Sequence, residues 1–101
     1  MNPQPKKKPH RNPEYLAFIR SKPCIICLRK AVAAHVRKQY WGAGARQKPH
    51  DYVAIPLCEE RYHHQTFDSI GMEAFEEKYN VDIKREIIYN LMEYVESKRH
   101  A

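Results

Sequence analysis

The chain has 101 residues and carries 18 Lys/Arg against 12 Asp/Glu, for a net charge of +6. This length favours one domain over two, and no stretch approaches the ~18 apolar residues of a membrane span. Three cysteines cannot all pair as disulfides, and the basic N-terminus lacks the apolar stretch of a signal peptide. We therefore expect a cytoplasmic protein whose thiolates bind zinc; the alternative is a set of buried apolar thiols.

The charge is strongly segregated along the chain. Residues 1–50 hold twelve Lys/Arg and one acidic residue, whereas residues 51–101 hold six Lys/Arg and eleven acidic residues. A basic half beside an acidic half is expected of a nucleic-acid-binding protein, with one face toward the phosphates. A basic surface that recognises an acidic protein remains an alternative.

Proline residues mark the boundaries of the first elements. Residues 1–12 are rich in proline and basic side chains and predict a disordered arm that attracts phosphates. Asn12 then fits a helix N-cap with Pro13 at the first helical position. The apolar face of this helix continues to about Lys22, and Pro23 ends it.

The rest of the chain predicts two strands followed by helices. Residues 31–37 and 52–57 read as strands, joined by a mobile basic loop over residues 39–50. A helix is expected from about Glu59 to Ser69, with its acidic residues in the first turn, and Gly71 breaks it. A short helix over residues 72–79 and a last helix over residues 83–98, capped by Asp82, complete the fold. We expect the apolar stripe of the last helix to pack into the core: Ile83, Ile87, Ile88, Leu91, Met92 and Val95. We therefore expect a single α+β domain over residues 13–101, with a ββα core at about 31–70 and C-terminal helices at about 72–99.

The residues that carry chemistry divide into two metal positions. Cys24 and Cys27 are separated by two residues, and Cys58 precedes a His pair. Neighbouring histidines on a helix point about 100° apart, so they rarely bind one ion. One can complete a Cys3His site, while the other joins Asp68, which lies four residues after His64 on the same helix face.

The order strand, loop, strand and helix, with a His on the first strand and His-x3-Asp on the helix, resembles the HNH endonucleases. More narrowly it resembles small phage and prophage nucleases that include the recombination-enhancement (Ref-type) enzymes. The segments that carry the resemblance span roughly residues 24–82: Ala34-His35-Val36, Lys48-Pro49-His50-Asp51, Pro56-Leu57-Cys58, His63-His64-x3-Asp68 and residues 70–79.

The resemblance implies a ββα-metal fold and cleavage of DNA phosphodiester bonds. His35 matches the general base, and its imidazole suits this role near neutral pH. His64 and Asp68 match the ligands of one divalent ion, Mg²⁺ or Mn²⁺, that acts as a Lewis acid. His35 should then face His64 and Asp68 across a gap of about one water and one phosphate oxygen.

The remaining ligand candidates form a separate, structural zinc site in this interpretation: Cys24, Cys27, Cys58 and His63. The gap of four residues between Cys58 and His63 is longer than usual, so either the helix start is distorted or another residue is the fourth ligand. DNA phosphates are expected to meet basic side chains on and after the first strand: Arg37, Lys38, Arg46 and Lys48.

Two positions stay open. His50 is either a third ligand or a DNA contact. Asp51 lies near the place of the family's middle Asn and is expected to order the loop. Ala34 stands where many HNH proteins carry a further metal ligand, which predicts weak metal affinity before DNA arrives.

The resemblance implies DNA as the partner, a recombinase as a second one, and a phage or prophage origin in a bacterial host. The rival functions are a non-catalytic zinc-dependent DNA-binding module and a protein-interaction adaptor that uses the last helix.

Overall fold

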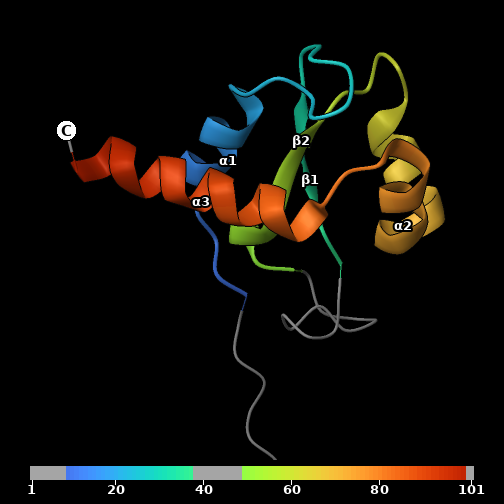
Figure 1. The fold of residues 1–101 in the computed structure, drawn as a ribbon. Coiled ribbons are helices and arrows are strands. Elements are labelled where there is room, and N and C mark those ends of the chain that lie inside the picture. The colour runs from blue at the N-terminus through green and yellow to red at the C-terminus, as the bar shows by residue number, and fades with distance from the viewer. Residues whose placement is uncertain (1–8, 38–48, 100–101) are drawn as a thin grey trace, which may run out of the picture.

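The computed structural model describes residues 9–37 and 49–99 of the chain. Within these ranges the protein has an α+β fold built on a two-stranded sheet. Figure 1 shows α1 and α3 on one side of the sheet and α2 on the other. In chain order the elements are α1 (Pro13–Arg20), β1 (Val32–His35), the 3-10 helix η2 (Asp51–Val53), β2 (Ala54–Leu57), α2 (His63–Tyr79) and α3 (Ile83–Arg99).

Helix α1 begins as the sequence predicts. The side-chain oxygen of Asn12 accepts a hydrogen bond from the backbone N–H of Tyr15 at 3.0 Å, and Pro13 occupies the first helical position. This cap satisfies one of the backbone donors that an N-terminus leaves unpaired. The helix buries Tyr15 and Ile19 completely, which fixes it against the sheet.

The two strands are antiparallel and short. Val32 pairs with Leu57, and His35 at the end of β1 pairs with Ala54 at the start of β2. The predicted second strand began at Tyr52, but residues 51–53 form η2 instead, and the ladder begins at Ala54. All four residues of β2 are buried, so this strand forms the centre of the domain and the end of β1 carries His35 to its edge.

Helix α2 begins later than expected. It starts at His63, and residues 59–62 form a turn in which the Tyr62 N–H bonds to the Glu59 carbonyl at 3.0 Å. Tyr62 has a left-handed backbone, with φ of 63°. The prediction that Glu59 and Glu60 lie in the first helical turn was therefore wrong, because the turn brings His63 back toward Cys58.

Gly71 divides α2, as predicted. Its φ of 84° and ψ of 174° interrupt the helix and redirect the segment that follows. This backbone region is essentially restricted to glycine. Phe67 lies before the break and Met72 and Phe75 after it, and all three are buried.

Helix α3 crosses the sheet and extends beyond it at its C-terminal end (Figure 1). Asp82 caps it as predicted, because its carboxylate accepts a hydrogen bond from the Arg85 N–H at 3.1 Å. Ile83 and Ile87 are buried. Leu91 is partly buried and packs against the core. The expectation that the whole apolar stripe packs into the core was wrong for Ile88, Met92 and Val95, because they are more than half exposed.

Candidate functional site

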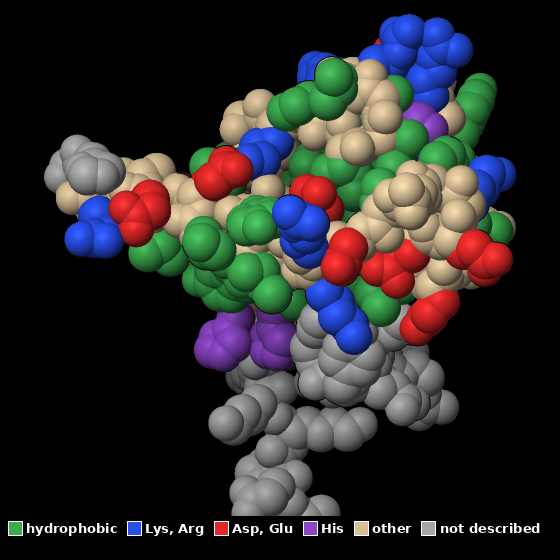
Figure 2. Space-filling model, in the orientation of Figure 1, with side chains coloured by type: hydrophobic (Ala, Val, Ile, Leu, Met, Phe, Trp, Pro, Cys, Tyr) green, Lys and Arg blue, Asp and Glu red, His purple; other side chains and the backbone are tan. Residues whose placement is uncertain are grey.

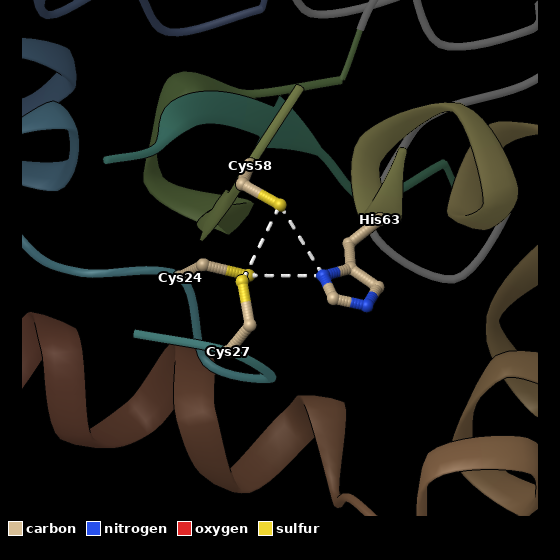
Figure 3. A group of neighbouring side chains, drawn as sticks. All are labelled: Cys24, Cys27, Cys58 and His63. Carbon is tan, nitrogen blue, oxygen red and sulfur yellow. Dashed lines mark hydrogen bonds between the residues drawn. The ribbon is translucent and has the colours of Figure 1, made fainter. Parts of the chain in front are cut away.

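Four side chains from three separate segments meet at one point beside the sheet (Figure 3). Cys24 and Cys27 come from the turn after α1, Cys58 follows β2, and His63 opens α2. Their ligand atoms all lie within 4.8 Å of one another. The Cys27 and Cys58 sulfurs are 3.5 Å apart, and His63 Nδ1 lies 3.2 Å from the Cys58 sulfur and 3.6 Å from the Cys24 sulfur. The predicted Cys3His cluster is therefore assembled, with His63 as its fourth member.

The cluster fits a tetrahedral metal ion. Zinc bonds of about 2.3 Å to sulfur place tetrahedral sulfur ligands about 3.8 Å apart, close to the separations here. A disulfide needs about 2.05 Å between the sulfurs, so all three cysteines are free thiols. Three sulfurs and one imidazole leave a tetrahedral ion no open position, which is consistent with a structural zinc.

Backbone hydrogen bonds hold the cysteine ligands in position. The N–H of Leu28 bonds to the Cys24 carbonyl at 2.9 Å, and Leu28 has a φ of 65°, so the segment from Cys24 to Leu28 closes as a tight knuckle. The Ile25 N–H donates to the Pro56 carbonyl at 3.2 Å, which attaches the knuckle to β2. The knuckle and the end of β2 are thus held together around the cluster.

The electrostatic surroundings favour the ligand forms of His63 and Cys58. Burial, and then the nearby charge of Arg61, lower the pKa of His63, so its imidazole stays neutral with a lone pair available. Burial acts to raise the pKa of Cys58, but hydrogen bonds from the backbone N–H groups of Arg61 and His63 and from the neighbouring thiols outweigh it. The pKa of Cys58 is consequently lowered, which favours the thiolate that a metal binds.

A second polar cluster centres on Asp51, which is 3% exposed. One carboxylate oxygen lies 3.0 Å from both Arg11 Nη1 and His35 Nε2, and the other accepts the Asn12 N–H at 2.7 Å. Burial acts to raise the pKa of Asp51, but these hydrogen bonds and the charge of His35 hold it below its usual value. Asp51 is thus a carboxylate, and His35 donates to it through Nε2.

Residues 10–12 belong to this cluster, although the sequence assigned them to the arm. Besides the bonds to Asp51, Arg11 donates to the Pro49 carbonyl at 2.9 Å, and the Asn12 amide donates to the Tyr52 hydroxyl at 2.9 Å. The Asp51 N–H returns a bond to the His10 carbonyl at 3.0 Å. The segment before α1 is therefore fastened to the residues behind His35.

His64 and Asp68 form the second predicted metal pair on α2. His64 Nε2 lies 3.3 Å from Asp68 Oδ2, one helical turn away, and both side chains are partly exposed. Two ligands at right angles, each about 2.1 Å from an octahedral ion, lie about 3.0 Å apart. The separation is that of an ion pair across one helical turn, and it also matches the spacing of two neighbouring ligands of one divalent ion.

His35 and Asp68 share a cavity of about 210 Å³ at the edge of the sheet. Arg37 and Gly71 also line it. The His35 side chain is 28% exposed, so it is not enclosed in the core. His64 is not among the residues that line this cavity, so the expected approach of His35 to His64 stays a prediction. Arg37 adds a guanidinium to the same wall.

Other predicted site residues have different outcomes. Lys38, Arg46 and Lys48 lie outside the described residues. His50 Nδ1 accepts a hydrogen bond from the His10 N–H at 2.8 Å, and the centroids of the two rings lie 5.1 Å apart. His50 is not among the residues that line the His35 cavity. Its place is beside the segment before α1.

Sequence reasoning missed Arg11 and the second role of Asn12. Their partner Asp51 is about 40 residues away along the chain, so no local spacing signals the contact. The helix-cap pattern at Asn12 was the one available sign that order begins before Pro13.

Comparison with known families places the chain in one of them. A family model described as "Protein of unknown function (DUF968)" matches residues 2–95. The chain belongs to the DUF968 family. No curated protein and no solved structure matches it. Within residues 9–37 and 49–99, no helix is both long and apolar enough to cross a membrane.

Proposed function

We propose that this DUF968 protein is a metal-dependent DNA endonuclease of the HNH type, with a zinc-stabilised ββα-metal core. The observation that carries the proposal is one cavity wall that combines His35, backed by the buried carboxylate of Asp51, with Asp68 of the helix pair. A base held by an orienting group beside a candidate metal position is the arrangement that hydrolysis requires.

His35 is the general base in this account. Because the Nε2–H group donates a hydrogen bond to Asp51, the neutral ring has its lone pair on Nδ1. This nitrogen takes a proton from a water, and the resulting hydroxide attacks the phosphorus in line with the leaving O3′. Asp51 keeps the ring in this tautomer and stabilises the imidazolium that forms.

His64 and Asp68 would hold one divalent ion, Mg²⁺ or Mn²⁺. When bound there, this ion supplies Lewis-acid stabilisation to the phosphate and the leaving oxygen. Two protein ligands leave positions for phosphate and water, which predicts that metal and DNA assist each other in binding. Arg37 lies on the same wall and neutralises charge on the phosphate.

The zinc in the Cys3His cluster is structural in this proposal. His63 and His64 are adjacent at the start of α2, so a metal bound to His63 fixes the position of His64. The zinc ion would thereby fix the position of one ligand of the catalytic ion.

The charge segregation of the sequence supports DNA as the substrate. Contacts mainly to phosphates imply low sequence specificity and affinity that falls steeply with salt. A role in phage DNA recombination or processing, with a recombinase as a partner, follows from the resemblance to the Ref-type nucleases.

The test is nicking of supercoiled plasmid with Mg²⁺ or Mn²⁺. Wild type and a Glu77→Ala control, which alters an exposed residue of α2, should nick equally. His35→Ala should be inactive while retaining zinc and DNA affinity. Equal nicking by wild type and His35→Ala would contradict the proposal. If wild type and both variants bind DNA but none of them nicks it, the result would favour the non-catalytic zinc module.

A further inference from the structure

Helix α3 carries a row of large apolar side chains that residues 9–37 and 49–99 leave largely exposed. Ile88, Met92 and Val95 are 56%, 55% and 55% exposed, and Tyr89 beside them is 45% exposed. Single exposed apolar residues are ordinary, but a continuous row on one helix marks an interaction surface. Figure 2 shows hydrophobic side chains gathered along the projecting part of α3.

The opposite side of α3 is already fixed to the domain. Ile83 and Ile87 are buried in the core, and ion pairs join Glu93 to Lys22 and Lys98 to Glu14 of α1. The exposed row therefore cannot turn inward to pack against the core unless α3 detaches from the domain.

The spacing of the row is that of a helix-pairing seam. Ile88, Met92 and Val95 follow one another at intervals of four and three residues, and Arg85 and Arg99 continue this spacing beyond the two ends of the row. This repeat keeps side chains facing a partner helix in a coiled-coil arrangement. Two shallow depressions flank Met92, one lined by Tyr89 and Glu93 and the other by Ile88 and Val95.

The charges beside the seam indicate which partner fits. Arg85, near the start of α3, and Glu96, near its end, lie on the same edge of the seam, because eleven residues are about three turns of helix, or about 16 Å. A second α3 that runs antiparallel about a two-fold axis brings Arg85 of each copy opposite Glu96 of the other. At this register Ile88 of each copy lies within one residue of the level of Met92 of the other, and Val95 lies level with Arg85 and Glu86. The surface is thus complementary to itself.

We propose that a second copy of this chain docks on the Ile88, Met92 and Val95 row, and that the two α3 helices pack antiparallel about a two-fold axis. Arg85 lies over the Tyr89 ring, with its guanidinium carbon 5.2 Å from the ring centroid, so it flanks the apolar row at one end. Glu96, which accepts from Arg99 at 3.1 Å, flanks it at the other. The dimer is independent of the proposed nuclease activity, and in an active nuclease it would place two sites on one DNA.

Sedimentation of the 101-residue, zinc-loaded chain tests the surface. Wild type should sediment as a concentration-dependent dimer, and Met92→Asp should raise the dissociation constant by at least tenfold. The control is Ile70→Asp, which places the same charge at an apolar residue of α2 that is 40% exposed and should leave the dimer unchanged. A wild type that remains monomeric at about 100 μM, or a dimer that survives Met92→Asp, would overturn the proposal.

A charge exchange tests the antiparallel direction. Arg85→Glu and Glu96→Arg should each weaken the dimer roughly threefold to thirtyfold, because each replaces two attractive contacts by two repulsive ones. The double variant restores both contacts and should recover most of the wild-type affinity. A double variant weaker than either single variant would exclude the antiparallel pairing, since a parallel pair never brings these two residues together.

Discussion

Replacing Asp51 by Asn should destabilise the protein by about 2–3 kcal/mol. All three groups around this carboxylate donate hydrogen bonds: the Asn12 N–H, Arg11 and His35. An amide has one accepting and one donating end, so at least one of the three donors must face another donor. A lost charge-assisted hydrogen bond at a buried site is worth about 1.5–3 kcal/mol, and the half-exposed Arg11 adds little more.

Urea unfolding of zinc-loaded protein measures this loss. The unfolding midpoint should fall by about 1–2 M for Asp51→Asn. Asp68→Asn is the matched control, because its side chain is 57% exposed and the change should stay within about 0.5 kcal/mol. An Asp51→Asn variant as stable as wild type would refute the argument that this cluster fastens the segment before α1 to the domain.

The same comparison has a pH dependence with a defined sign. The folded-state pKa of Asp51 is lowered from its ordinary value of 3.8, so the carboxylate stabilises the fold above that pH. This contribution is lost as the pH falls through the folded-state pKa. The stability difference between wild type and Asp51→Asn should therefore shrink as the pH falls below about 4. A difference that keeps growing below about pH 4 would contradict this assignment.

Three further predictions concern metal, backbone and DNA. His63→Ala should abolish stoichiometric zinc binding measured by atomic absorption, whereas His64→Ala should keep the zinc; retention by both would exclude His63 as a ligand. Gly71→Ala should destabilise the fold by about 1–3 kcal/mol in the same urea assay, because its φ of 84° suits only glycine although open space surrounds it. Arg37→Ala should weaken DNA binding and reduce the slope of log affinity against log salt by about one, and an unchanged slope would remove Arg37 from the phosphate contacts.

The features that the sequence predicted are decided by local chemistry. Asn12 before a proline and Asp82 before an apolar run act as helix caps through hydrogen bonds within three residues. Gly71 breaks α2 through its own backbone conformation, which depends on no distant partner. The Cys24 and Cys27 pair was recognised for the same reason, since a two-residue gap encodes the knuckle.

The features that the sequence did not predict depend on distant partners. The helical propensity of residues 59–62 gives way to a turn because His63 must reach Cys58 and Cys24. Arg11 gains its role only when folding brings Asp51 beside it. Periodicity showed that α3 has an apolar face, but it cannot tell that the sheet covers Ile87 and leaves Met92 exposed.

Chemical rescue of His35 tests the central claim most directly. If His35 removes a proton from the attacking water, His35→Ala should fail to nick supercoiled DNA with Mg²⁺ or Mn²⁺, and added imidazole should restore part of the rate. Rescue should rise with the concentration of neutral imidazole and should be absent in Asp68→Ala, which lacks a metal ligand rather than a base. Undiminished nicking by His35→Ala, or equal stimulation of both variants by imidazole, would contradict the account.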